Sequence, residues 1–280
     1  MPMLPKDRIA IVIPARLSST RLPRKMLLAE TGRPLIEHTW RSASRSGLAG
    51  RVIVATDSDE IAEAVRRFGG EAVMTSPDAP SGTARICGML DRIPNAEIIV
   101  NVQGDEPEID PHAIDLAVGL LERRPSAGMA TLVTPLRSRE DLADPACVKA
   151  VLTPWRSDGE SSRGPVDGCW RAITFSRAPV PFAREWRDEL LISEPPLYWQ
   201  HVGLYAYRRR LLEGWESLPE SRLAAVESLE QLRAVEAGVG IAAAAVASHA
   251  RGIDTPKDYA AFVARTATAP EPAGRSRSSG

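Results

Sequence analysis

Cysteine is scarce in this sequence of 280 residues, and several other common signatures are missing. Cys87, Cys147 and Cys169 show no Cys-x-x-Cys spacing, which excludes the usual zinc motifs and a disulfide framework and favours a reducing, cytoplasmic compartment. No apolar run reaches 18 residues and residues 1–8 contain no secretory core, so we expect no membrane segment. Neither G-x-x-x-x-G-K-[ST] nor G-x-G-x-x-G occurs, so side-chain cations, more than glycines, would have to hold any nucleotide.

An excess of positive charge is also missing. The chain has 35 Lys and Arg against 36 Asp and Glu, a formal net charge of −1 at pH 7, which argues against a general nucleic-acid-binding protein. Cations therefore act locally, as they would on a small anionic substrate. A length of 280 residues suits one large α/β domain or two small ones, with an ample core.

Strand and helix patterns alternate through the first half of the chain. Apolar runs predict buried strands, and amphipathic segments with glycine stops predict helices. The expected strands are 9–13, 51–56, 71–74 and 97–102, and the expected helices are 34–46, 59–68 (capped by Asp57), 82–92 and 111–123. Repeated βα units predict a parallel, doubly wound sheet.

The pattern changes between about residues 130 and 200 and then returns. Short β-like runs at 129–135, 148–152 and 170–175 surround a polar loop at 153–168 that we expect to be flexible. The α/β alternation resumes with expected strands at 202–207 and 240–247 and expected helices at 208–213, 226–236 and 256–266. Residues 267–280 are rich in Ala, Pro, Gly, Ser and Arg and predict a disordered tail.

A cationic loop directly follows the first strand. It carries Arg16, Arg21, Arg24 and Lys25. Because ligands of open α/β sheets bind at the carboxyl ends of the strands, this loop is a candidate for binding a polyanion. Arg offers forked donors and Lys a compact charge, so a triphosphate is the natural ligand. The alternative is a loop that is only solvated.

Two acidic segments are candidates for a metal site at the same edge. In Asn101–Pro107, Asp105 follows a buried strand, and a strand-tip carboxylate beside a cationic loop suggests a Mg²⁺ ligand. The alternative is a helix cap before Pro111. Asp254 precedes a helix that we expect to begin at Pro256, a position typical of a helix cap. It becomes a candidate metal ligand only as a partner of Asp105.

Eight motifs occur in order from residue 9 to residue 256. They are P-A-R-x-x-S-T-R-L-P-x-K, A-T-D, S-G-T, N-V-Q-G-D-E-P, F-S-R, H-x-G-x-Y-x-Y, L-E-Q-L-R and G-x-D-T-P. With this order, the chain strongly resembles the CMP-KDO synthetases (3-deoxy-manno-octulosonate cytidylyltransferases). The resemblance implies a Rossmann-like, GT-A-like nucleotidyltransferase domain over residues 1–266, with a mixed, mostly parallel sheet flanked by helices. It also implies a homodimer formed through an inserted β-rich region at about 130–200.

The resemblance further implies a reaction and its residues. CMP would pass from CTP to a small acidic acceptor, a sugar acid, with Mg²⁺ and with release of pyrophosphate. Arg16, Arg21 and Lys25 would hold the triphosphate; Pro14, Ala15, Ser81 and Gln103 would surround the cytosine and ribose; and Asp105 and Asp254 would coordinate Mg²⁺. The acceptor pocket would be lined by Arg177, Arg184, His201, Tyr205, Glu230 and Gln231. Arg16, Lys25, Asp105 and Asp254 form the expected catalytic set.

Four positions depart from the family's pattern. Arg24 stands where Gly is usual, Ala84 where Glu is usual, Gln200 where Arg is common and Ala224 where an acidic residue is frequent. The nucleotide and metal motifs are intact, so the departures concern the acceptor. A related branch that serves phosphonate biosynthesis attaches CMP to phosphonoformate, which would need cationic clamps such as Arg24, Arg177 and Arg184. A phosphonoformate cytidylyltransferase is therefore the alternative function.

Overall fold

A computed structural model of the chain describes residues 4–156 and 168–268, so most of the predicted loop at 153–168 and of the predicted tail lies outside the described residues. The strands are β1 (Ile9–Ala15), β2 (Arg51–Thr56), β3 (Glu71–Met74), β4 (Ile98–Asn101), β5 (Met129–Pro135), β6 (Lys149–Pro154), β7 (Cys169–Ser176), β8 (Trp199–Arg208) and β9 (Ile241–Ala245). The α-helices are α1 (Leu35–Ala43), α2 (Asp59–Arg67), α3 (Gly82–Cys87), α4 (Pro111–Arg123), α5 (Arg139–Ala143), α6 (Arg209–Glu213), α7 (Arg222–Glu227), α8 (Gln231–Glu236) and α9 (Pro256–Thr268).

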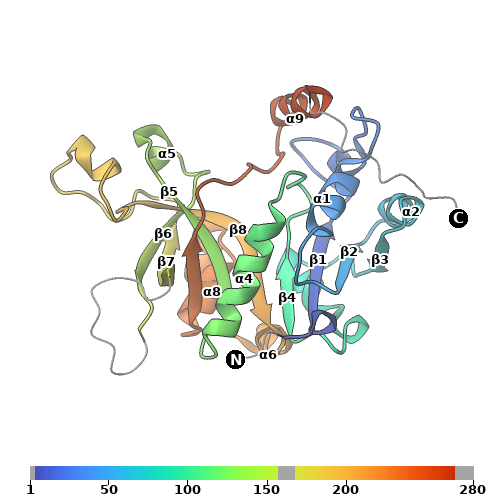
Figure 1. Cartoon of the computed structure of the whole chain (residues 1–280), viewed down its shortest axis with the longest axis horizontal. Coiled ribbons are helices and arrows are strands. Elements are labelled where there is room, and N and C mark those ends of the chain that lie inside the picture. Colours follow the sequence, from blue (N-terminus) through green and yellow to red (C-terminus); the bar gives the residue numbers. More distant parts are fainter. Residues whose placement is uncertain (1–3, 157–167, 269–280) are drawn as a thin grey trace, which may run out of the picture.

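The described strands form one mixed sheet in the order β3-β2-β1-β4-β8-β5-β9-β7-β6 (Figure 1). β1 pairs in parallel with β2 and β4, and β2 pairs in parallel with β3, as the repeated βα units predict. The expected mixed sheet is confirmed, but it is not mostly parallel. Beyond β4, β5 and β9 pair in parallel, whereas β8 is antiparallel to both β4 and β5, and β7 is antiparallel to β6 and β9. Apolar runs reveal strands but not their direction, and β8 pairs with β4 and β5, which are distant from it in the sequence.

Three predicted helix details are wrong. Ser58, not Asp57, caps α2 by accepting a hydrogen bond from the Ile61 N–H. The predicted helix 82–92 ends at Cys87 and is followed by a separate 3₁₀ turn at Leu90–Arg92. The predicted helix 226–236 is two short helices, because Ser228 adopts a left-handed conformation with φ of 50° and ends α7.

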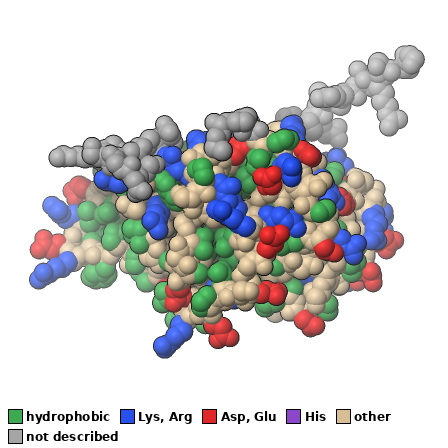
Figure 2. Space-filling model, turned by 90° about the horizontal axis from the view of Figure 1, so that it is seen from below, with side chains coloured by type: hydrophobic (Ala, Val, Ile, Leu, Met, Phe, Trp, Pro, Cys, Tyr) green, Lys and Arg blue, Asp and Glu red, His purple; other side chains and the backbone are tan. Residues whose placement is uncertain are grey.

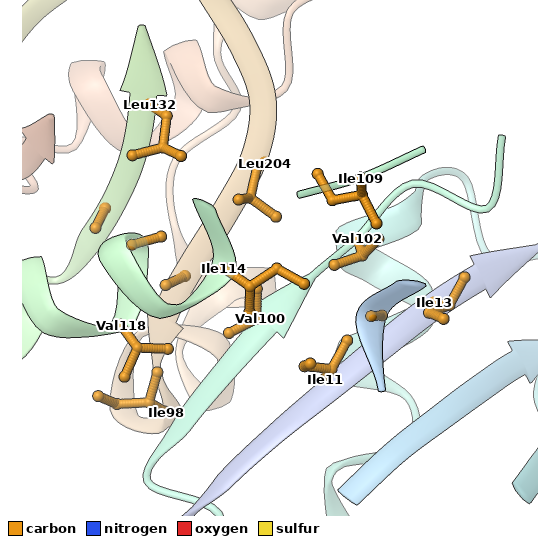
Figure 3. Packing of buried hydrophobic residues seen from close by; sticks show 14 of the residues in the cluster. Ile11, Ile13, Ile98, Val100, Val102, Ile109, Ile114, Val118, Leu132 and Leu204 are labelled. Carbon is orange, nitrogen blue, oxygen red and sulfur yellow. The ribbon is translucent and has the colours of Figure 1, made fainter. Parts of the chain in front are cut away.

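The core lies on both faces of the sheet. Along β1, Ile11 and Ile13 face one cluster, shared with α1, α2 and α4, whereas Ala10 and Val12 face another, shared with α3, α6 and α8. Figure 3 shows part of the first cluster, in which Ile114 and Val118 of α4 lie over the strands. Burial on both faces explains why these strands read as continuous apolar runs.

The expected β-rich insertion is part of the main sheet. β5, β6 and β7 contribute three of its strands, and the segment between β7 and β8 extends away from the body (Figure 1). That segment carries Phe182, which is 84% exposed, and Ile192, which is 70% exposed. Over residues 4–156 and 168–268 we find no helix with the length and apolar character needed to span a bilayer.

Candidate functional site

Lys25 lies at the centre of the candidate site. It opens a short 3₁₀ turn (Lys25–Leu27) in the cationic loop after β1 and is only 7% exposed. Its Nζ atom donates to Oδ2 of Asp105 at 2.6 Å and to Oδ1 of Asp254 at 3.3 Å. One buried ammonium therefore joins the two aspartates that the sequence singled out, which lie on different loops.

The loop after β4 places Asp105. A Cβ atom on Gly104 would lie 2.9 Å from the Pro14 carbonyl oxygen and 3.1 Å from the Met26 sulfur, so only glycine fits this close approach to β1. The Thr39 hydroxyl of α1 donates to the Gly104 carbonyl at 2.8 Å, and Ser42 fixes the end of the same loop through the Pro107 carbonyl. These contacts hold the Asp105 carboxylate at the carboxyl edge of the sheet.

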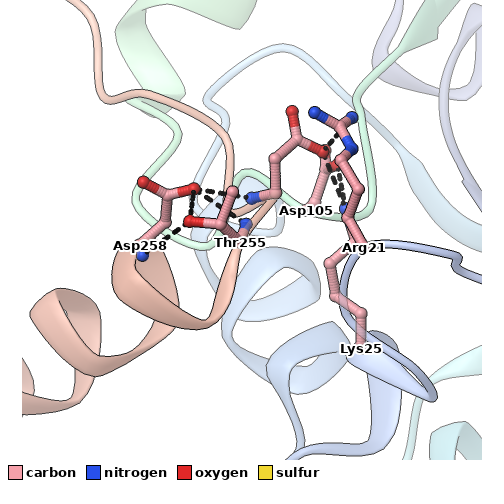
Figure 4. Close-up of polar contacts among 6 residues, drawn as sticks. Arg21, Lys25, Asp105, Thr255 and Asp258 are labelled. Carbon is pink, nitrogen blue, oxygen red and sulfur yellow. Dashed lines mark hydrogen bonds and ion pairs between the residues drawn. The ribbon is translucent and has the colours of Figure 1, made fainter.

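A backbone hydrogen bond brings Asp254 beside Asp105. The Ile253 N–H donates to the Asp105 carbonyl at 2.9 Å, and Ile253 is buried against α9. Thr255 and Asp258 form a capping box at the start of α9: the Thr255 hydroxyl accepts from the Asp258 N–H, and the Asp258 carboxylate accepts from the N–H groups of Asp254 and Thr255 and from the Thr255 hydroxyl (Figure 4). These hydrogen bonds, led by that of Thr255, lower the pKa of Asp258. The Asp254 side chain is therefore not the cap and turns to Lys25 and to Arg21, at 3.0 Å.

The donor set at this point suits a magnesium ion shared with phosphate. In the described part of the chain, no three His, Cys, Asp or Glu side chains gather in a metal-binding group. Mg²⁺, however, is commonly held by one or two carboxylates together with substrate phosphate oxygens and water. Asp105 and Asp254, which contact the same ammonium, supply that number of carboxylates, so the residues present fit this ion when a nucleotide provides the remaining oxygens.

The predicted nucleotide residues surround the same edge. Pro14 and Ala15 end β1, and the Arg16 guanidinium donates to the Ala79 carbonyl on the loop before α3. Ser81 caps α3 by accepting from the Ala84 N–H at 3.1 Å. Gln103 donates to the Gly203 carbonyl of β8 at 3.4 Å, so its amide reaches across to the acceptor side.

His201 and Tyr205 of β8 lie together, with ring centroids 5.2 Å apart. Burial, with a smaller effect of His249, lowers the pKa of His201 to about 3, so the ring is neutral at physiological pH. His201 Nε2 lies 3.0 Å from the Thr131 hydroxyl, which itself donates to backbone carbonyls of β8. Burial raises the pKa of Tyr205 well above its usual value, so the phenol is also neutral.

Glu230 and Gln231 link the two halves of the predicted site. The Ser81 hydroxyl donates to the Glu230 carboxylate, which joins a predicted nucleotide residue to a predicted acceptor residue. Gln231 begins α8 and is 4% exposed, and among the described residues its Nε2 has no hydrogen-bond partner. A buried amide donor without a partner is costly, which is consistent with a ligand contact at this position.

Arg177 and Arg184 are not brought into this cluster in the same way. The Arg177 guanidinium donates to the carbonyl oxygens of Glu227 at 2.6 Å, Pro145 at 2.9 Å and Ser228 at 3.3 Å, so it holds the end of α7. Arg184 is exposed on the segment that follows β7. Their contact with an acceptor stays a prediction.

Arg24 has a local explanation. Its φ of 56° lies in the left-handed region, where glycine is at ease, which accounts for the glycine expected from the resemblance. The guanidinium forms an exposed ion pair with Glu60 of α2. It is therefore engaged with a neighbouring helix and not with the acceptor residues.

Sequence reasoning missed two residues. Asp258 determines the position of Asp254, and the only signal was its place three residues after Thr255, the spacing of a capping box. Glu106 is half-buried beside Asp105, and burial, followed by the Asp105 charge, raises its pKa to about 8. Glu106 belongs to the N-V-Q-G-D-E-P motif, but a sequence motif does not show which way a side chain points.

The sequence matches a family described as cytidylyltransferase over residues 10–241. It is 48% identical over 256 residues to a 3-deoxy-manno-octulosonate cytidylyltransferase of Rhodopirellula baltica, with 91% of this chain and 97% of the relative covered. A protein of the same name from Geobacter sulfurreducens is 43% identical over 254 residues, with 89% and 96% covered.

Solved structures show the same similarity. The chain resembles a CMP:2-keto-3-deoxy-manno-octonic acid synthetase complexed with CTP, with a TM-score of 0.81 and 37% identity over 93% of this chain and 98% of the other. A cytidylyltransferase from Leptospira borgpetersenii shares the fold, with a TM-score of 0.56 and 17% identity. The match covers 91% of this chain and 85% of that protein.

Proposed function

The chain belongs to the cytidylyltransferase family, and from that premise we propose that it transfers CMP from CTP to 3-deoxy-manno-octulosonate, a sugar acid, and releases pyrophosphate. It is a CTP-dependent nucleotidyltransferase. The observation that carries the proposal is the pair of ion contacts of Lys25 with Asp105 and Asp254, at the sheet edge where a nucleotide would bind.

The cations around this pair suit a triphosphate. Lys25 balances the two carboxylates from a buried position. Arg21 is 66% exposed at its side chain, and a phosphate could compete with Asp254 for its guanidinium. Arg16 lies on the same loop and offers a forked donor. Together they would neutralise charge that grows on the phosphate oxygens as the acceptor oxygen attacks the α-phosphorus and pyrophosphate leaves.

We propose Mg²⁺ as the cofactor, bound by Asp105 and Asp254. When bound, this ion would draw electron density from the phosphate oxygens and neutralise part of their charge. The chain's own part is to hold the two carboxylates in register through Lys25, through the Ile253–Asp105 backbone hydrogen bond and through the cap at Asp258.

On the acceptor side, neutral side chains and one carboxylate accompany the predicted arginines. His201 is uncharged, and its ring and that of Tyr205 present flat apolar surfaces with polar edges. Such surfaces suit a sugar ring better than a small dianion. The phosphonoformate alternative gains no support from the relatives named above.

We also propose a homodimer in the cytoplasm. The exposed side chains of Phe182 and Ile192 on the segment between β7 and β8 are the apolar surface that a second copy would cover. Figure 2 shows basic and acidic side chains interspersed over the lower face of the molecule, with no broad basic patch on that face. This distribution supports our expectation that nucleic acid is not a partner.

A screen of pyrophosphate release tests the proposed function. CTP, UTP, GTP and ATP are each supplied with Mg²⁺ and with 3-deoxy-manno-octulosonate, related ulosonic acids or phosphonoformate. We expect turnover with CTP and the sugar acid. Turnover only with phosphonoformate would replace the acceptor, turnover with another nucleotide would replace the donor, and calorimetric CTP binding without any product would indicate a catalytically silent protein.

A further inference from the structure

Glu106 and Asp105 are neighbours in the chain, but their side chains face different parts of the site. The Asp105 carboxylate contacts Lys25, whereas Oε1 of Glu106 lies 3.7 Å from the position that a Cβ atom on Gly203 would occupy. Glu106 therefore lies against β8, between the carboxylate pair and the strand that carries the predicted acceptor residues.

The surroundings of Glu106 are those of the acceptor pocket. Gly203 lies between His201 and Tyr205, and its carbonyl accepts the hydrogen bond from Gln103. The backbone of Glu106 is fixed by its N–H bond to the Gln103 carbonyl at 3.1 Å and by the Ile109 N–H, which donates to its carbonyl at 3.2 Å.

Within residues 4–156 and 168–268, no cation and no hydrogen-bond donor engages the Glu106 carboxyl group. A carboxyl group that is partly withdrawn from water and lacks partners is costly to the free protein. Its cost falls when a ligand supplies donors. Hydroxyl groups are such donors, and the oxygens of a carboxyl group accept hydrogen bonds from them.

We infer that Glu106 accepts hydrogen bonds from hydroxyl groups of the acceptor and selects polyhydroxylated acids. This inference rests on the proposed function and deepens it by naming a residue that determines the specificity for the acceptor. A sugar acid carries several alcohol hydroxyls in addition to its carboxylate. Phosphonoformate has no alcohol hydroxyl to donate to the Glu106 oxygens, so it leaves them without partners.

Variants of Glu106 combined with acceptor analogues test this role. Steady-state pyrophosphate release is measured for the wild type, Glu106→Ala and Glu106→Gln, with the sugar acid and with analogues that each lack one hydroxyl. The control is Glu108→Gln, because Glu108 is an exposed neighbour that pairs with Arg265. We expect Glu106→Ala to raise the KM for the sugar acid about tenfold and to leave the KM for CTP within about twofold. With the analogue that lacks the hydroxyl contacted by Glu106, the substitution should no longer change the KM for the acceptor. Glu106→Gln recovers part of the loss.

The double comparison separates contact from structure. If the effect of Glu106→Ala is the same for every analogue, or falls equally on the KM for CTP, the inference is overturned. If Glu106→Ala does not fold, as judged by its melting temperature and by CTP binding, the same cycle is run with Glu106→Gln. A wild-type protein that is inactive with every sugar acid refutes the proposed function itself, whereas an active wild type without coupling refutes only the role of Glu106.

Discussion

Lys25 and Asp254 are separated by 229 positions in the chain, and their charged groups lie 3.3 Å apart. Three segments must pack together to form this contact: the turn after β1, the loop after β4 that carries Asp105, and the segment that leads into α9. Because Lys25 is buried, it stays between the two carboxylates, and the candidate metal site and the candidate phosphate site share one residue.

Asp105→Asn tests the role of this cluster in turnover. The amide keeps the shape of the side chain but removes the charge that Lys25 and a metal ion need. We therefore expect pyrophosphate release to fall about 100-fold or more, and the melting temperature to fall as well because the buried ammonium keeps only its contact with Asp254. The control is Asp91→Asn, a change at a side chain that is 75% exposed and pairs with its neighbour Arg92. Unchanged turnover in Asp105→Asn refutes the metal role.

Asp258→Ala tests whether the cap of α9 positions Asp254. Removing the carboxylate of this capping box costs about 1 kcal/mol of the free energy of unfolding, and it also releases the N–H groups of Asp254 and Thr255. We expect a lower kcat and a higher Mg²⁺ requirement. Asp110→Ala is the matched control, because Asp110 caps α4 through the His112 N–H. Equal losses of activity in both variants would show that only stability matters.

Gly104→Ala tests the close approach of the β4 loop to β1. The new methyl group would lie 2.9 Å from the Pro14 carbonyl oxygen, so the loop that carries Asp105 has to shift. We expect a loss of about 1–3 kcal/mol in the free energy of unfolding and a marked loss of activity. Gly88→Ala is the control, because its methyl group would meet two carbonyl oxygens at 3.7 Å, an ordinary contact. A fully active, stable Gly104→Ala protein contradicts this account.

Arg24→Gly separates a backbone role from an acceptor role. The substitution relieves a left-handed residue, worth about 1 kcal/mol, and loses a comparable amount through backbone entropy and an exposed ion pair with Glu60. We therefore expect the melting temperature and both KM values to stay close to those of the wild type. A selective rise in the acceptor KM would restore Arg24 as a clamp and with it the phosphonoformate alternative.

The strands and the site loops could be predicted from sequence because their signals are local. The apolar runs of β1 and β2 are buried on both faces, and the cations of the first loop follow a strand end directly. The predictions of β3 at 71–74 and of α4 at 111–123 match the observed bounds.

What failed depends on contacts between distant parts of the chain. Nothing local in β8 shows that it runs antiparallel to β4. A left-handed residue is usually predicted from a glycine, but the one that divides α7 from α8 is Ser228. The direction of Glu106 toward Gly203 is likewise a property of packing, not of its motif. Asp254 was paired with Asp105 only through the resemblance, since its own neighbourhood is that of a helix cap.

His201 predicts a pH dependence of stability. Burial lowers the pKa of this ring to about 3, whereas an unfolded histidine titrates near 6.5. Between these values the unfolded chain binds a proton that the folded chain does not, so the free energy of unfolding falls as the pH is lowered, by about 1.4 kcal/mol per pH unit well inside the window. In His201→Gln this contribution disappears, and we expect a shallower decline between pH 6.5 and 4.5 in denaturant titrations. His112→Gln, at an exposed position of α4, is the control. Equal slopes for His201→Gln and the wild type would mean that the ring is protonated in the folded protein, contrary to its burial against Phe175 and Tyr205.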